Sequence, residues 1–288
     1  MKVFRIAFVA AALCAMTATA SSDELYGTLK KVRDTKTFTI GFREASFPFA
    51  YYDDDKKPVG FAVELCNRIA DALKQQLNLP DLAVRYLPIN AQTRIPLLTN
   101  GTIDIECGST TNNLVRQQQV DFSYNIYVTG GRLLVSKASG IKEIEDLNGK
   151  VVAVSSGSSN ERVLRGLVTE LKLTPKYVTV KDHAEGLLAV ETGRADAYAH
   201  DEVGAYSLIS KSTHKDRFDV VGRLLSFDPY GLMMRRDDSA FKLVVNRTLA
   251  MIFRSGEVYQ MYKRHFDPFG IPLTPAVDWN FKLNSVPD

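Results

Sequence analysis

Glu-Cys-Gly-Ser-Thr-Thr-Asn-Asn-Leu-Val-Arg, residues 106–116, is the stretch that decides the fold. It follows an alternating segment, residues 102–105, that predicts a strand, and it leads into a predicted helix. Gly108 and the polar residues 109–113 form the turn between strand and helix. Unpaired N–H groups at the start of the helix and the guanidinium of Arg116 favour a bound anion such as a carboxylate. The alternative is a capped surface helix with a solvated arginine.

Strand-like and helix-like segments alternate on both sides of this stretch. Before it, the pattern predicts strands at 38–42, 83–87 and 102–105 and helices at 62–77 and 93–99. After it, the pattern predicts strands at 132–136, 151–154, 177–180, 197–199 and 230–234, and helices at 160–171, 184–191, after 201, at 240–254 and at 257–265. Residues 269–288, rich in proline and aromatic residues, predict a tail that wraps the surface. Two α/β lobes explain this order most simply, with a shared cleft beyond the carboxyl ends of their strands.

The first twenty residues combine basic residues, an apolar core and Ala-Thr-Ala before Ser21, which predicts a secretory signal peptide over residues 1–20. No later apolar run is long enough to span a bilayer, so we expect a soluble mature chain in the periplasm. Cys14 follows the bulky Leu13, which does not favour a lipid anchor. The remaining chain is long enough for two domains with separate cores.

Composition excludes several classes of function. The chain has 36 basic and 33 acidic residues and a formal net charge of +3, so it lacks the strong positive charge of a nucleic-acid-binding protein. Cys66 and Cys107 lie in apolar segments, where a free buried cysteine acts as a small hydrophobe. We expect two free thiols, with a disulfide as the alternative. The four histidines are scattered, so we expect no metal site and no cofactor.

Five further polar positions lie where a predicted strand ends or a predicted helix begins. Arg43 follows the strand at 38–42, and Arg94 begins a helix whose end already carries partial positive charge, which a nearby anion would offset. The serine-rich loop 155–159 precedes another helix, and His183 and Asp201 follow strands of the second series. The alternatives are surface arginines, a capped loop, a structural histidine and a helix cap.

These residues resemble the bacterial periplasmic solute-binding proteins for polar amino acids, and most of all the members that bind glutamate and aspartate for ABC importers. The resemblance runs from about residue 25 to the tail and is most specific at Gly41-Phe42-Arg43-Glu44, Thr93 to Leu98, Glu106 to Asn113, Lys181-Asp182-His183 and Tyr230-Gly231. It implies a two-lobed periplasmic binding protein fold of type II, with mostly parallel sheets flanked by helices and two hinge strands near 126–131 and 225–230. Lobe 1 would comprise 21–127 and 229–288, and lobe 2 would comprise 128–228.

The resemblance also implies where an amino acid would bind. It places the α-carboxylate on Arg116, Thr111 and Ser158, the ammonium on Asp201 and the backbone of Ser109, and the side-chain carboxylate on Arg43, Arg94 and His183. Three arginines against one aspartate leave a surplus of two positive charges, which favours a dicarboxylic amino acid over a neutral one. Close relatives carry a serine where this chain has Ala91, so the balance between glutamate, aspartate and a neutral relative stays open.

The resemblance therefore implies a monomeric binding component of an ABC transporter that captures glutamate or aspartate by hinge closure and delivers it to a membrane permease. It implies no catalytic residue. One alternative is a secreted enzyme on the same fold, similar to cyclohexadienyl or arogenate dehydratases, which would need a general acid near its substrate. Others are a binding protein for a neutral amino acid such as glutamine and a sensory domain of the same fold.

Overall fold

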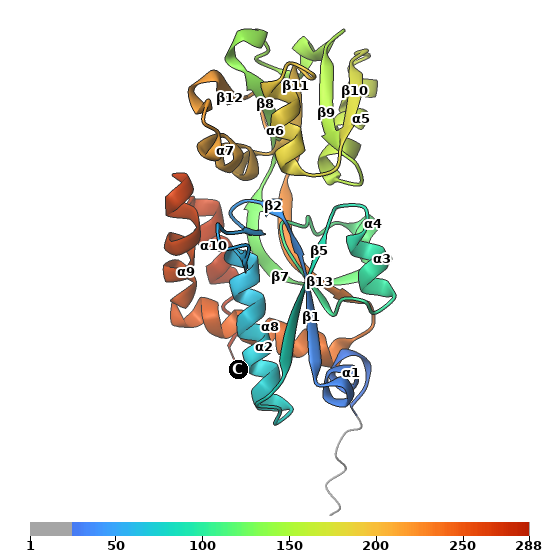
Figure 1. Ribbon diagram of the computed structural model, residues 1–288, viewed down its shortest axis with the longest axis vertical. Helices are drawn as coiled ribbons and strands as arrows, with labels where there is room; N and C mark the ends of the chain where they lie inside the picture. Colours follow the sequence, from blue (N-terminus) through green and yellow to red (C-terminus); the bar gives the residue numbers. More distant parts are fainter. Residues whose placement is uncertain (1–24, 288) are drawn as a thin grey trace, which may run out of the picture.

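The computed structural model describes residues 25–287 and divides them between two α/β lobes, each built on a five-stranded sheet (Figure 1). The first sheet has the order β5-β1-β6-β13-β7, with β1 Thr37–Arg43, β5 Ala83–Ile89, β6 Ile105–Cys107, β7 Val120–Thr129 and β13 Asp228–Arg235. The second has the order β10-β9-β11-β8-β12, with β8 Gly131–Ser136, β9 Val151–Ser155, β10 Lys176–Val180, β11 Ala197–Asp201 and β12 Phe218–Val221.

Each sheet is mostly parallel. Four strands run in one direction, and a single strand runs against them, β13 in the first sheet and β8 in the second. A small antiparallel sheet of β2 Ala45–Ser46, β3 Ala50–Tyr52 and β4 Pro58–Val59 follows β1. The carboxyl ends of β1, β6, β9, β10 and β11 meet where the two lobes face each other, which is the arrangement that the alternating pattern predicts.

Helices cover both sheets. The first lobe carries α1 Gly27–Thr35, α2 Phe61–Gln76, α3 Arg94–Thr99, α4 Leu114–Gln117, α8 Ser239–Ser255, α9 Glu257–Phe266 and α10 Pro275–Leu283. The second carries α5 Ser159–Glu170, α6 His183–Glu191 and α7 Glu202–Lys211, and short 3-10 turns lie at Lys137–Ser139, Ile144–Leu147, Lys215–Arg217 and Asp267–Phe269. No helix of residues 25–287 is long and apolar enough to cross a membrane.

The core of the first lobe lies between its sheet and the helices α2, α8, α9 and α10. Alternate residues of β1, Phe38 and Ile40, are fully buried against the apolar face of α2. Burial of such side chains contributes about 1.5–3 kcal/mol each. The second lobe has a cluster of buried hydrophobic residues on each face of its sheet. Its strands therefore read as nearly continuous apolar runs, as buried parallel strands do.

Two connections join the lobes (Figure 1). The first runs from β7 through Gly130 into β8, and the second returns into β13, where Asp228 pairs with Thr129. A side chain at Gly130 would collide with the carbonyl of Ser226, so the close approach of the two connections requires glycine there.

The helices and strands that the sequence predicts are present, with bounds shifted by a few residues. The tail, which was predicted only to wrap the surface, contains a helix that was not predicted, because residues 275–283 form α10. Pro275 occupies the first turn, the hydroxyl of Thr274 accepts from Val277 N at 3.3 Å, and Phe281 is fully buried. The helix α1 and the strand β12 were not predicted. The predicted signal peptide lies outside the described residues.

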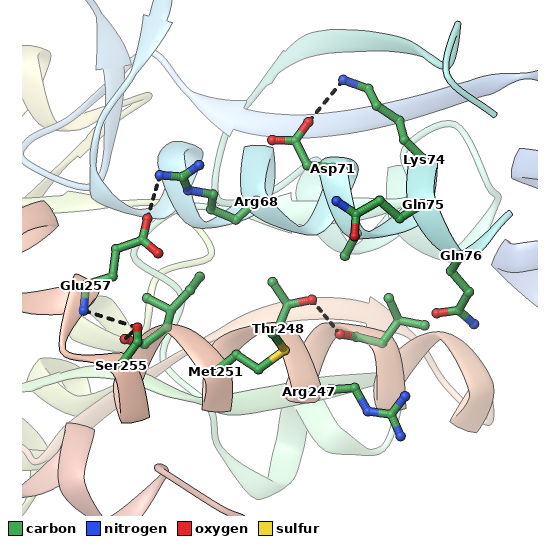
Figure 2. Close-up of a pocket in the computed structure, with 13 residues that line it drawn as sticks. Arg68, Asp71, Lys74, Gln75, Gln76, Arg247, Thr248, Met251, Ser255 and Glu257 are labelled. Carbon is green, nitrogen blue, oxygen red and sulfur yellow. Dashed lines mark hydrogen bonds and ion pairs between the residues drawn. The ribbon is translucent and has the colours of Figure 1, made fainter. Parts of the chain in front are cut away.

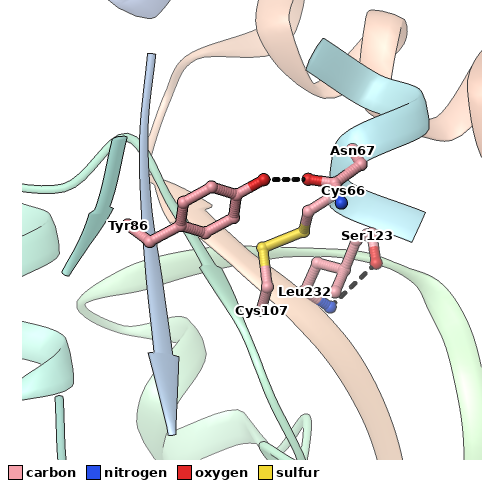
Figure 3. The surroundings of a disulfide bond; sticks show 6 residues. All are labelled: Cys66, Asn67, Tyr86, Cys107, Ser123 and Leu232. Carbon is pink, nitrogen blue, oxygen red and sulfur yellow. Dashed lines mark hydrogen bonds between the residues drawn. A yellow bond between two sulfur atoms is a disulfide. The ribbon is translucent and has the colours of Figure 1, made fainter. Parts of the chain in front are cut away.

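The expectation of two free thiols was wrong. Cys66 on α2 and Cys107 on β6 form a disulfide, with their Cα atoms 6.4 Å apart (Figure 3). Both are fully buried because α2 packs across β6, which brings the apolar face of the helix opposite the last residue of the strand. The bond fixes α2 to the strand end from which the polar turn of residues 108–113 departs. Beside it, Tyr86 donates to Asn67 Oδ1 at 2.6 Å.

Candidate functional site

Two buried arginines of the first lobe lie at one end of the site. Arg43 ends β1 and Arg94 begins α3, and each is only 3% exposed. Arg94 Nη1 donates to the hydroxyl of Thr110 at 2.5 Å, while its Nε has no hydrogen-bond partner among the described residues. Burial lowers the pKa of both guanidinium groups, and for Arg94 the neighbouring charge of Arg116 adds to the effect. Cations held out of water in this way favour an anionic ligand.

A histidine of the second lobe contacts one of these arginines, Arg43. His183 begins α6, and its Nε2 lies 3.3 Å from Arg43 Nη2. Its Nδ1 lies 2.8 Å from the hydroxyl of Tyr198, which lies 2.7 Å from the hydroxyl of Ser155. Burial, and then the neighbouring His200, hold the pKa of His183 well below its usual value. The ring is therefore neutral near pH 7, and Tyr198 fixes its orientation.

His200 supports His183 from within the second lobe. The two rings stack with centroids 4.1 Å apart, and His200 is buried. Burial and the charge of Arg43 lower the pKa of His200 to about 3. Both rings therefore stay uncharged at neutral pH.

Arg116 lies at the other end of the site, on the short helix α4. Asn113 caps the start of this helix, and its Oδ1 accepts from Arg116 N at 3.0 Å. The guanidinium donates to the Thr111 carbonyl at 2.7 Å and reaches the Gly157 carbonyl of the second lobe at 3.5 Å. The guanidinium is therefore held between the lobes by one backbone carbonyl from each of them.

The polar turn before α4 is tied to its surroundings. The hydroxyl of Thr111 lies 2.9 Å from that of Ser159, and the hydroxyl of Ser109 lies 2.6 Å from that of Ser46. The hydroxyl of Ser158 caps α5 by accepting from the backbone N–H of residue 161 at 3.1 Å. The structure therefore brings Ser159, rather than the Ser158 hydroxyl, into contact with Thr111.

Asp201 ends β11 and is the buried carboxylate of the second lobe at this site. Its Oδ2 accepts from the hydroxyl of Tyr230 at 2.5 Å, and its Oδ1 has no hydrogen-bond partner among the described residues. Burial, and then the charge of Asp228, raise the pKa of Asp201 to about 7. An ammonium group beside Oδ1 would supply the missing partner and favour the ionised form.

The lobes are closed over these groups. The contacts described above join the lobes at Arg43, Thr111, Arg116 and Asp201. In addition, Gln92 Nε2 donates across the cleft to the hydroxyl of Ser156 at 2.7 Å. Closure explains why side chains at strand ends, which the sequence alone could not distinguish from surface residues, are almost fully buried.

All eight residues singled out from the sequence lie around the junction of the two lobes, at the strand and helix ends described above. Four further residues were missed there: Glu106, Tyr198, His200 and Tyr230. Tyr198 and His200 belong to the strand that ends in Asp201, and their alternation with Ala197 and Ala199 reads only as a buried strand. Among the described residues, no group of three or more histidine, cysteine, aspartate or glutamate side chains is placed to hold a metal ion.

A groove with a volume of about 1000 Å³ lies elsewhere, between α2 and α8 (Figure 2). Arg68 pairs with Glu257 at one end at 2.5 Å, and Lys74 pairs with Asp71 on α2 at 3.0 Å. A smaller and mostly apolar pocket of about 330 Å³ lies beside the connections between the lobes, next to Phe227. Neither contains a residue of the predicted site.

Comparison with known proteins agrees with this architecture. Residues 38–268 match the family described as bacterial extracellular solute-binding proteins, family 3. The chain is 43% identical over 265 residues to an L-glutamate/L-aspartate-binding protein of Pseudomonas aeruginosa, covering 91% of this chain and 87% of the relative. It is 41% identical over 258 residues to a glutamate/aspartate import solute-binding protein of Salmonella typhimurium, covering 89% and 84%.

Among solved structures, a mutant arginine-binding protein of T. maritima has a TM-score of 0.74 at 25% identity, covering 84% of this chain and all of that one. An ancestral amino-acid-binding protein, described as a precursor of cyclohexadienyl dehydratase, has a TM-score of 0.70 at 27% identity with the same coverage. The two-lobed arrangement is the type II periplasmic binding protein fold. With four fifths of its length matched to one family, the chain belongs to family 3 of the bacterial extracellular solute-binding proteins.

Proposed function

We propose that this protein is the substrate-binding component of an ABC importer for an acidic L-amino acid, glutamate or aspartate. The observation that carries the proposal is the contact of Arg43 of the first lobe with the neutral His183 of the second, within reach of the charge of the buried Arg94. A side-chain carboxylate there would accept from both guanidinium groups and from the ring, so it would bridge the lobes. The relatives named above support the same ligand class.

The α-amino acid group binds at the other end of the site in this proposal. Arg116, with Thr111 and the loop at Ser158, holds the α-carboxylate, and Asp201 with the Ser109 backbone holds the ammonium. The unpartnered Oδ1 of Asp201 supports this assignment, since an ammonium is the group that a buried carboxylate accepts from most favourably.

The ligand contacts both lobes and therefore favours the closed form over the open one. The closed protein, a monomer, would then dock on its membrane permease. In this proposal residues 1–20 direct export to the periplasm and are removed. Lobe 1 comprises 21–127 and 229–288, and lobe 2 comprises the intervening residues.

Calorimetric titration of the mature protein with glutamate, aspartate, glutamine and arginine tests the proposal. The acidic ligands should bind at least tenfold more tightly than glutamine, because glutamine would leave the charge of Arg43 and Arg94 uncompensated. Binding of glutamine equal to or better than that of glutamate would overturn the proposal. Ala91 is buried in the turn before α3 and offers no hydroxyl to the side-chain carboxylate, which leaves the preference between glutamate and aspartate open. The same titrations measure that preference.

A substitution separates the two ends of the site. Arg116→Ala should abolish binding of all four amino acids, because the α-carboxylate is common to them. Arg33→Ala is the control, since Arg33 is exposed on α1 and pairs with its neighbour Asp34. Normal binding by the Arg116 variant would show that the carboxylate assignment is wrong.

We do not propose an enzyme, although one structural neighbour is described as a dehydratase precursor. A dehydratase needs an acid beside the leaving group. In our proposal Asp201, which titrates near pH 7, is occupied by the ammonium of the ligand. Turnover of prephenate or arogenate by the purified protein would reverse this conclusion.

A further inference from the structure

Glu106 is a buried carboxylate without a hydrogen-bond partner. It lies in β6, the central strand of the first sheet, and is fully buried, and neither carboxylate oxygen has a partner among the described residues. Asp104, two residues earlier, is equally buried but accepts from Lys31 at 2.6 Å, Thr39 N at 2.9 Å and Arg235 at 3.0 Å. The two carboxylates therefore differ in role, because Asp104 is satisfied by the fold and Glu106 is not.

The side chain of Glu106 leaves the sheet on the same face as Arg43. Glu106 pairs with Gly41 on β1, and Arg43 lies two residues further along that strand. A side-chain carbon at Gly108 would lie 2.7 Å from Glu106 Oε1 and 3.1 Å from Arg43 Cγ. Gly108 thus leaves room for the carboxylate and the arginine stem to approach each other. Arg94 reaches the same region from α3, which packs against β6.

Charges connect Glu106 with the site. Burial raises the pKa of its carboxyl above the usual value, while Arg94, the nearby hydroxyl of Thr110, Arg43 and Arg116 act in the opposite direction. In return, the charge of Glu106 raises the pKa of each of these arginines against the effect of burial. The carboxylate therefore stabilises three buried cations that have few other partners.

The count of charges changes once Glu106 is included. Three arginines and Asp201 alone leave the site with two surplus positive charges, and glutamate brings one net negative charge. A surplus would remain buried in the closed protein, which is costly. With Glu106 the surplus among these five side chains is one positive charge, which the net charge of glutamate would offset.

We propose that Glu106 is a positioning and specificity-determining residue, which orients Arg43 and Arg94 and sets the net charge of the site so that it selects amino acids with one net negative charge. The inference rests on the proposed function. It predicts discrimination in both directions, against neutral amino acids such as glutamine and against doubly negative ones such as O-phospho-L-serine at pH 8.

The test is calorimetric titration of Glu106→Gln with glutamate, glutamine and O-phospho-L-serine at pH 8. Loss of the charge should shift the affinity ratio of phosphoserine to glutamate upward by about tenfold or more, and the ratio of glutamine to glutamate downward. Glu106→Asp should keep the wild-type ratios even where all three affinities fall. Asp104→Asn is the matched control, with lower thermal stability and unchanged ratios.

The proposal would be overturned if a folded Glu106→Gln variant kept the wild-type affinity ratios among the three ligands, whether all three affinities fell equally or none changed. Should that variant not fold, the wild-type protein still tests it. Phosphoserine takes up a proton on its phosphate near pH 6 and then carries one net negative charge. Its affinity relative to glutamate should rise several-fold between pH 8 and pH 5.5, because titration of Asp201 affects both ligands equally. A constant ratio would overturn the proposal, whereas absence of glutamate binding to the wild type would instead overturn the proposed function.

Discussion

Lowering the pH from 8 to 6 should weaken glutamate binding, because Asp201 takes up a proton in this interval. Burial, and then the charge of Asp228, raise the pKa of its carboxyl to about 7, against the opposing effects of Tyr230, Asn160 and Arg116. The ammonium group of an amino acid pairs with the ionised carboxylate. Binding therefore releases a proton from the fraction of molecules in which Asp201 is protonated.

The size of the effect follows from the pKa of about 7. About nine tenths of the carboxyl groups are ionised at pH 8 and about one tenth at pH 6, so affinity should fall about tenfold, or about 1.4 kcal/mol. The histidines of the site do not titrate in this window, since the pKa of His183 is well below its usual value and that of His200 is about 3. The stability of the ligand-free protein should depend on pH in the opposite direction. The folded state holds this proton longer than the unfolded chain does, so the contribution of Asp201 to stability falls as the pH rises from about 4 to 7.

Isothermal titration at pH 6, 7 and 8, in buffers with different ionisation enthalpies, measures both affinity and proton release. About half a proton should be released per glutamate at pH 7. Glutamine should show the same pH dependence, because it carries the same ammonium group. The Asp201→Asn variant should bind glutamate weakly, and its affinity should not depend on pH in this interval. An affinity constant within twofold between pH 6 and pH 8, with no proton release, would refute the reasoning.

Three further predictions follow from the same contacts. Arg94→Gln should weaken glutamate binding by about 1.5–3 kcal/mol and glutamine binding by less; equal losses in calorimetry would contradict its assignment to the side-chain carboxylate. Replacing both Cys66 and Cys107 by alanine should lower the free energy of unfolding by about 4 kcal/mol, since the bond closes a separation of 41 residues; an unchanged midpoint in urea would contradict this. Tyr198→Phe should lower glutamate affinity by about 1 kcal/mol, because the ring of His183 loses its orienting hydroxyl; unchanged affinity would show that ring stacking suffices.

The order of elements and the places of the charged groups could be predicted from the sequence. A residue after an apolar strand in an α/β pattern lies at the carboxyl end of the sheet whatever the packing details, which is why Arg43, His183 and Asp201 were found. The helix α10 also had a local signal, since Thr274 and Pro275 form a helix start that the proline and aromatic content of the tail obscured.

The remaining features depend on contacts between distant segments. The pairing of Cys66 with Cys107 follows from the packing of α2 across β6, which no local pattern specifies. Glu106 alternates with buried residues of its strand and gives no sign of which helix covers its face. Its role becomes visible only when α3 brings Arg94 to that face, and for this reason the count of charges from sequence was too positive by one.

The interior position of β13 in the first sheet has a consequence for the order in which the molecule can be completed. This strand lies between β6 and β7 in the first sheet, yet residues 228–235 are synthesised after every strand of the second sheet. The second sheet is continuous in the chain and can form as a unit, whereas the first has a missing middle strand until the chain is nearly finished. The sheet of the first lobe, which begins earlier in the chain, is thus the last to be completed. A chain truncated before residue 228 would expose the edges of β6 and β7 to other chains.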